Sequence, residues 1–128
     1  MEQTYSNLIA YRPQPGVMTQ RIVFLLKLKR GLDKNLNRTN LSAEIMAHEM
    51  DMSESALNHK LESILNQSIS DFINQYRLQR AAEFLSAGYK VNDVSQRVGF
   101  KTTSHFSQSF KEYYQKTPSA FLKESADF

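Results

Sequence analysis

The sequence predicts an all-α fold of about seven helices, and three observations support that prediction. Apolar residues recur every three or four positions along most of the chain, as they do on one face of a helix. Alternation of apolar and polar residues, which is typical of strands, appears in no segment. Serine, threonine, glycine and proline interrupt the helical pattern repeatedly, which predicts several short helices rather than one long helix.

The composition restricts the chain to one compact domain, or two very small subdomains, without redox chemistry. The 128 residues include no cysteine for disulfides, thiolate metal sites or nucleophilic attack, which also fits a reducing cytoplasm. The net charge of +3 favours a polyanionic partner only mildly. No apolar run approaches the roughly 18 residues of a membrane span, so we expect no membrane partner.

The N-terminal quarter is expected to hold a tail and one helix. Residues 1–18 are polar and contain Pro13, Pro15 and Gly16, which oppose helix and strand alike and therefore predict a tail or linker. A first helix is predicted over residues 19–36. Its apolar residues follow a roughly helical spacing at Ile22, Leu25, Leu26, Leu28 and Leu32.

A pair of short helices joined by a tight turn is predicted next, over residues 42–65, and this pair has the outline of a helix-turn-helix unit. Ser42 and Ser53 are positioned to cap its two helices. A long linking helix is expected to follow over residues 69–87. Ser68 is positioned to cap its start.

A second helix-turn-helix unit is predicted over residues 92–114, with its turn at Gly99. Thr117 and Pro118 then begin a last helix, before a C-terminal tail of residues 123–128. The two halves share a spacing of four, seven and four residues, at Leu57, Leu61, Ser68 and Phe72 and again at Phe106, Phe110, Thr117 and Phe121. The repeat therefore predicts two similar units joined by the linking helix.

The second unit resembles the second helix-turn-helix of the AraC/XylS family of bacterial transcription regulators. The resemblance rests on residues 91–100 (VNDVSQRVGF), on residues 104–111 (SHFSQSFK) and on the Thr-Pro pair that follows. Residues 77–81 (RLQRA) match the linking helix, and the first unit matches at Ala47, Ser53, Leu57 and Leu61. The resemblance covers residues 19–122, which it implies are a DNA-binding domain of this type.

Three residues depart from the family pattern. Asn66 and Gln115 stand where the family usually has a glycine that ends the second helix of a unit. Asparagine tolerates the left-handed conformation expected there, and glutamine does so less readily. Gln108 stands where the family commonly has arginine.

The second helix of each unit, over residues 54–65 and 103–114, carries the residues expected to read DNA. Bases are read in the major groove through hydrogen bonds, which require short polar or planar side chains on an exposed helix face. The candidates for base contact are Ser55, Asn58, His59, Thr103, Ser104, His105 and Gln108. The candidates for phosphate contact are Arg38, Lys60, Lys101, Thr102 and Lys111, with backbone amides at helix starts near Ser42 and Asn92.

The resemblance implies sequence-specific binding to double-stranded promoter or operator DNA by a transcription regulator, and an activator that touches RNA polymerase. If the linking helix separates the units by about one DNA turn, roughly 34 Å, both second helices enter successive major grooves. A cytoplasmic, nucleoid-associated protein is expected. An effector-binding domain, a protein partner, and the choice between monomer and dimer stay open.

The main alternative is an architectural or protein-interaction module with the same helices and no base reading. In that case Ser55, Asn58 and Glu62 form an ordinary solvated helix face. An enzyme is not expected, because no acid, base and nucleophile cluster in the sequence. His48, His59 and His105 lie on different predicted elements, so neither a metal site nor another cofactor is expected.

Overall fold

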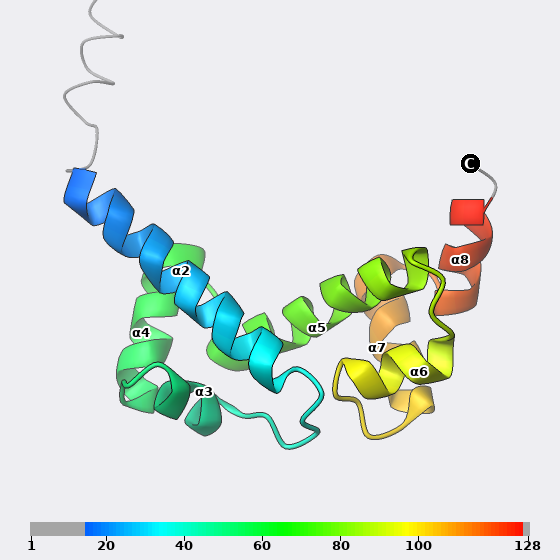
Figure 1. The fold of residues 1–128 in the computed structure, drawn as a ribbon, viewed down its shortest axis with the longest axis horizontal. Coiled ribbons are helices and arrows are strands. Elements are labelled where there is room, and N and C mark those ends of the chain that lie inside the picture. The colour runs from blue at the N-terminus through cyan, green and yellow to red at the C-terminus, as the bar shows by residue number, and fades with distance from the viewer. Residues whose placement is uncertain (1–14, 127–128) are drawn as a thin grey trace, which may run out of the picture.

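A computed structural model describes residues 15–126 of the chain, and every regular element among them is a helix (Figure 1). This confirms the predicted all-α class. In chain order the elements are α2 (Pro15–Asn35), α3 (Ala43–Glu49), α4 (Glu54–Leu65), α5 (Ile69–Ser86), α6 (Val91–Arg97), α7 (Thr103–Tyr114) and α8 (Pro118–Ala126). The long helix α5 joins a group formed by α2, α3 and α4 to a group formed by α6, α7 and α8.

Serine or threonine side chains cap the N-termini of five of these helices. In each case the side-chain oxygen accepts a hydrogen bond from the backbone N–H three residues later, at 3.0 to 3.3 Å. This bond satisfies an amide that has no partner inside the helix. The capping residues are Ser42, Ser53, Ser68, Thr102 and Thr117.

Three helix boundaries differ from the approximate positions that the sequence predicted. The first helix begins at Pro15 rather than near residue 19, because proline fits the first turn of a helix, where its missing N–H would have no partner. Helix α6 begins at Val91 rather than Asn92, and its N-cap residue, Lys90, makes no side-chain capping bond that would mark the start. The last helix continues to Ala126, beyond the predicted end at residue 122. The first 14 residues of the predicted tail lie outside the described part.

The second helix of each unit, α4 or α7, ends in a left-handed residue despite the missing glycine. We call α4 and α7 the recognition helices, after the role that the sequence predicts for them. Asn66 has a φ of 56° and Gln115 a φ of 62°.

The turn of the second unit contains a glycine that the structure requires. Gly99 has a φ of 85°, and a Cβ atom there would lie 2.4 Å from the carbonyl oxygen of Leu36.

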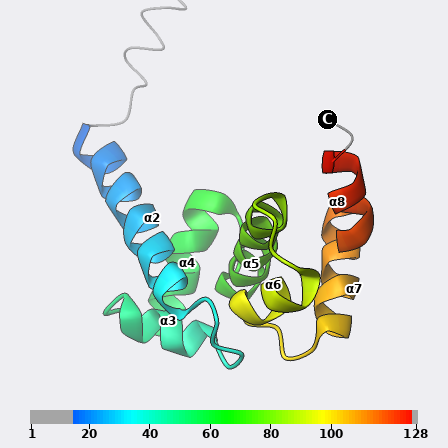
Figure 2. The same ribbon diagram turned by 45° about the vertical axis from the view of Figure 1, so that its right-hand side comes forward.

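Both recognition helices lie on the same side of the molecule. Figure 1 draws α2 in front of α4 and α6 in front of α7. In the turned view of Figure 2, α4 and α7 have moved to the right of these two helices, as elements lying behind them must. Helices α2 and α6 therefore support the recognition helices from the opposite side.

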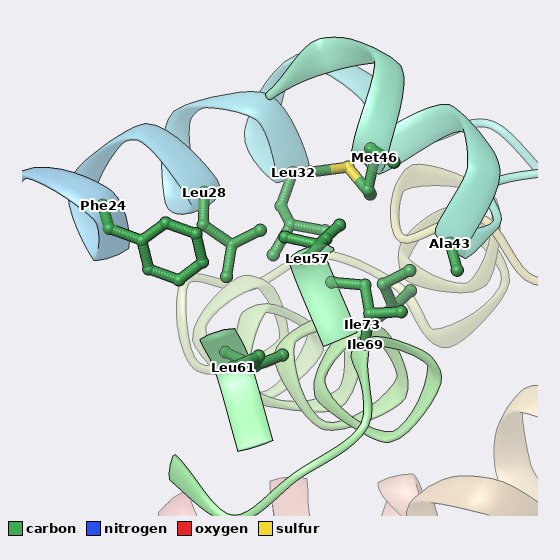
Figure 3. Packing of buried hydrophobic residues seen from close by; sticks show 10 residues of the cluster. Phe24, Leu28, Leu32, Ala43, Met46, Leu57, Leu61, Ile69 and Ile73 are labelled. Atoms are coloured by element: carbon green, nitrogen blue, oxygen red, sulfur yellow. The ribbon is translucent and has the colours of Figure 1, made fainter. Parts of the chain in front are cut away.

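The molecule has two hydrophobic cores, one for each unit. The first contains Phe24, Leu28 and Leu32 of α2 packed against aliphatic residues of α3, α4 and α5 (Figure 3). The second is rich in phenylalanine and is formed by α5, α6 and α7 together with Leu36, just after α2. Of the five apolar residues that predicted the first helix, only two are buried in the first core, and Ile22 and Leu26 are exposed.

Candidate nucleic-acid interface

Helix α4 presents one polar face because its opposite face is fixed in the first core. Leu57 and Leu61 are fully buried and belong to the same cluster as the leucines of α2. Ser55 and His59 are exposed and lie four residues apart, so they share the outward face. Two of the predicted base-contact residues are therefore accessible from the side that faces away from α2.

Asn58 has a partner within the chain that the sequence did not indicate. Its side-chain oxygen accepts a hydrogen bond of 3.0 Å from the backbone N–H of Ile69. Ile69 is the first residue of α5, where a backbone N–H has no partner inside the helix. Asn58 therefore ties α4 to α5. A bidentate contact between Asn58 and adenine would have to compete with this bond.

Helix α7, like α4, buries its apolar face and exposes its polar face. Phe106 and Phe110 are fully buried in the second core, whereas Ser104, His105 and Gln108 are exposed. The ring of His105 lies edge-on to the ring of Phe100 with 5.3 Å between the ring centroids. The predicted base-contact residues Ser104, His105 and Gln108 therefore lie outside the core.

Thr103, the first residue of α7, is half-buried and bonded to the preceding helix. Its hydroxyl donates a hydrogen bond of 2.7 Å to the side-chain oxygen of Asn92 in α6. Asn92 is consequently the second residue of α6 and a partner of α7, rather than the start of a helix as predicted. Each recognition helix is thus tied to a neighbouring helix through one asparagine.

Three predicted phosphate contacts surround α7 and are exposed. Lys101 and Thr102 stand immediately before the helix, and Lys111 lies in its last two turns. The hydroxyl of Thr102 accepts a hydrogen bond from the backbone N–H of His105, and its own hydrogen is still able to donate to a phosphate. The second unit therefore carries hydrogen-bond donors suited to phosphates at both ends of its recognition helix.

The two predicted phosphate contacts of the first unit are arranged differently. The ammonium group of Lys60 lies 4.8 Å from the centroid of the Phe24 ring, which directs this side chain toward α2. Arg38 lies in the loop between α2 and α3, where its guanidinium donates to the side-chain oxygen of Asn35 at 3.0 Å. Both cations already have partners in the domain.

The two units also differ in the number of their acidic and basic side chains. Residues 42–66 include five carboxylates and one lysine, whereas residues 91–115 include two carboxylates and three basic side chains. Phosphates are attracted by lysine and arginine and repelled by carboxylates. Of these two segments, the second therefore has the charge that is more favourable beside phosphates.

The two units are braced against each other near Gly99. Arg77 of α5 donates a hydrogen bond of 2.5 Å to the carbonyl oxygen of Arg38, in the loop that precedes the first unit. Burial lowers the pKa of Arg77, because removal from water disfavours its charge. A Cβ atom on Gly99 would lie 2.7 Å from the same guanidinium. Arg77 therefore joins the linking helix to the loop before the first unit and lies against the turn of the second unit.

A second brace joins α2 to α5. The hydroxyl of Tyr76 donates a hydrogen bond of 2.5 Å to Asp33, and Arg80 lies 3.7 Å from the same carboxylate. Burial is the main cause that raises the pKa of Tyr76, and the bond to Asp33 adds to it. These contacts hold the supporting helix of the first unit against the linking helix.

The geometry defines a class of protein. Two helix-turn-helix units on one braced support, with short polar side chains exposed on the same side, form a double helix-turn-helix DNA-binding domain. None of the helices within residues 15–126 is long and apolar enough to cross a membrane. In the same part of the chain, no three His, Asp or Glu side chains gather into a metal-binding group.

Comparisons with known proteins identify the family. A family model described as a helix-turn-helix domain matches residues 46–124. The transcriptional regulatory protein HptR of Staphylococcus aureus (strain NCTC 8325 / PS 47) is 28% identical over 92 residues, which are 72% of this chain and 36% of HptR. The chain therefore spans about a third of the length of that relative.

Two solved structures share the fold. A transcriptional regulator with an AraC-type DNA-binding domain from Chromobacterium violaceum has a TM-score of 0.73 at 20% identity, over 84% of this chain and 96% of that chain. The DNA-binding domain of AdpA, a global transcriptional factor solved in complex with a target DNA, has a TM-score of 0.69 at 19% identity. This match covers 78% of this chain and 90% of the AdpA chain. The chain belongs to the AraC/XylS family of helix-turn-helix DNA-binding transcription regulators.

Proposed function

We propose that this chain recognises a specific site in double-stranded DNA by inserting α4 and α7 into successive major grooves. The observation that supports this most strongly is the position of both recognition helices on one side of the molecule, away from α2 and α6 (Figures 1 and 2). Successive major grooves on one face of DNA lie about one turn, roughly 34 Å, apart. A single domain then reads two half-sites of different sequence.

Within this proposal the predicted residues divide into two roles. Residues on the outward faces contact base edges, and the asparagine-linked positions, Asn58 and Thr103, chiefly hold the helices at the required angle. Lys101, Thr102 and Lys111 contact phosphates, while Arg38 and Lys60 contribute less. The residues proposed to touch bases are Ser55, His59, Ser104, His105 and Gln108.

The regulatory role is proposed from the family. We infer that the bound domain acts at promoters in the cytoplasm, as an activator that contacts RNA polymerase. This part of the proposal rests on the AraC/XylS relationship, and the base-reading part rests on the exposed faces of α4 and α7. The two parts are therefore tested separately.

The test of DNA reading is in vitro selection of bound duplexes from a random pool at near-physiological salt. We expect an enriched motif with two half-sites about 10 base pairs apart. A Ser55→Ala, His59→Ala variant should lose sequence preference in one half-site, and a Ser104→Ala, Gln108→Ala variant in the other. Lys123→Ala, on the exposed surface of α8, is the matched control.

The same experiment can also contradict the proposal. Weak, salt-sensitive binding without any enriched motif would overturn sequence-specific regulation and favour the architectural module. Activation is then tested by transcription in vitro from a promoter that carries the selected motif. An unchanged transcript level on saturated DNA would contradict the activator role and leave the DNA-binding role intact.

A further inference from the structure

The first half of α2 exposes an apolar patch that neither core uses. The patch consists of Met18, Ile22, Val23 and Leu26, which are 46%, 54%, 45% and 57% exposed. These are four of the seven exposed large hydrophobic side chains among the described residues. Because residues three and four apart share a helix face, the four side chains form one continuous surface. Contiguous apolar surfaces of this kind mark interaction sites.

A groove continues this patch toward the first helix-turn-helix unit. It encloses a cavity of about 350 Å³ between α2 and the turn that joins α3 to α4. Val23 belongs to both the patch and the groove, whose other apolar residues are Phe24, Met50 and Met52. Methionine side chains adapt to irregular apolar shapes. A concave apolar channel beside a helix is suited to receive the side chains of another helix.

The charge around the groove selects among possible occupants. Lys27 and Lys60 line the groove, and the first basic residues of α2 are Arg21, Lys27, Lys29 and Arg30, with no acidic residue in this helix before Asp33. A second copy of α2 would bring like charges together, which is unfavourable across an interface. A partner with carboxylates beside an apolar stripe complements the surface.

The location of the patch permits binding at the same time as DNA. Helix α4 buries Leu57 and Leu61 toward α2, so its outward face points away from the patch. Figure 1 also shows the first turns of α2 projecting beyond α4, where no other described element covers them. Lys60 is the one residue of α4 that lines the groove, so the groove and the exposed Ser55–His59 face of α4 lie on different sides of the first unit.

We propose that the α2 patch and its groove bind an acidic amphipathic helix of a partner protein. The apolar stripe of that helix packs on Val23, Leu26 and the methionine-lined channel. Its flanking carboxylates lie near Lys27 and Lys60. This interaction is separate from the proposed DNA recognition and does not depend on it.

The test uses a synthetic helical peptide of about 18 residues, or five turns, with leucines at i, i+3, i+4 and i+7 and glutamates beside them. The matched control peptide has lysine in place of every glutamate. Titration into the ¹⁵N-labelled chain should shift amide signals around Val23 and Met52 with the acidic peptide only. Val23→Ser or Leu26→Ser should weaken binding about tenfold, and Lys27→Glu should reverse the preference between the peptides.

Several results would overturn this proposal. They are the absence of shifts up to about 1 mM peptide, equal binding of both peptides, or affinity that Val23→Ser does not change. Self-association that Leu26→Ser abolishes would identify a second copy as the occupant instead. Binding to phosphatidylserine vesicles without peptide binding would identify a membrane surface.

Controls separate this interaction from folding and from DNA recognition. Val23 and Leu26 are exposed, so their serine variants should keep the circular dichroism spectrum and unfolding midpoint of the wild type. Both variants should also keep wild-type DNA affinity. A Ser55→Ala, His59→Ala variant should retain peptide binding.

Discussion

The two helix-turn-helix units share their geometry but differ in what fills their cores. Among the described residues, Phe24 is the one aromatic side chain buried in the first core, whereas the second core buries Phe100, Phe106 and Phe110 beside six aliphatic residues. Phe110 has ring centroids of Phe106, Tyr114 and Phe121 within 4.6 to 5.7 Å. The comparison teaches that the repeated spacing of apolar and capping residues sets the fold, and that different packing chemistry satisfies the same spacing.

The units also differ in charge, and this difference concerns function. The recognition helix of the first unit lies in an acidic segment, and its lysine is directed toward Phe24. The second unit has basic residues before α7 and within it. We therefore expect the second unit to supply most of the affinity for DNA, and the first to contribute chiefly to the choice of sequence.

The largest expected effect comes from the aromatic core. Phe110→Ala should lower the free energy of unfolding by about 4 kcal/mol, because the deletion leaves a large cavity among three rings. Leu61→Ala in the first core should cost about 3 kcal/mol. Urea unfolding followed by circular dichroism measures both. A larger loss for Leu61→Ala would show that the first core contributes more to stability.

Substitution of glycine in the second unit should have the next largest effect. Gly99→Ala should cost about 3 kcal/mol, because its φ is positive and the new Cβ would collide with the Leu36 carbonyl. Gly88→Ala is the matched control, since Gly88 also has a positive φ but open space around it, and it should cost about 1 kcal/mol. Equal losses in urea unfolding would contradict the close contact at Gly99.

The charge comparison is tested by salt dependence. A Lys101→Ala, Lys111→Ala variant should reduce the slope of log affinity against log salt by about 2, because two phosphate contacts are lost. Lys60→Ala should reduce the slope by less than about 0.5, since its ammonium lies over Phe24. Fluorescence anisotropy with labelled duplex measures the slopes. A larger change for Lys60→Ala would reverse the assignment of affinity to the second unit.

The smallest expected effects come from Asn58 and Asn92, and they show whether these residues hold the helices in position or contact DNA bases. Asn58→Ala should lower the free energy of unfolding by about 1 kcal/mol, because it removes the acceptor of a partly buried hydrogen bond from the Ile69 N–H. Asn92→Ala should cost about 0.5 kcal/mol, because water can reach the exposed bond to Thr103. If Asn58→Ala keeps full stability but loses base preference in one half-site, Asn58 reads DNA directly.

Local signals in the sequence were sufficient for most of the fold. Ser42, Ser53 and Ser68 cap helices through bonds only three residues long, which a sequence pattern detects directly. The buried face of α2 could not be predicted in the same way. Residues 22–26 are apolar on every side of the helix, so the packing of α3 and α4 decides which of them are buried.

The exposure of the two candidate DNA-reading faces was predictable from the sequence, but the hydrogen bonds that hold them were not. Spacing alone was enough to put Ser55 and His59 on the outer side of α4. The bonds from Asn58 to Ile69 and from Thr103 to Asn92 each span 11 residues between helices, and no local pattern marks them. The orientation of Lys60 over an aromatic ring likewise depends on how α2 packs.

The most direct test of the central claim is affinity cleavage of a selected DNA site. The chain has no cysteine, so Ser55→Cys and Ser104→Cys each provide a single position for an iron–chelate label on α4 or α7. If α4 and α7 occupy successive major grooves, the two labels should cut the same face of the duplex about 10 base pairs apart. Overlapping cuts, or strong cutting from only one label, would contradict this arrangement.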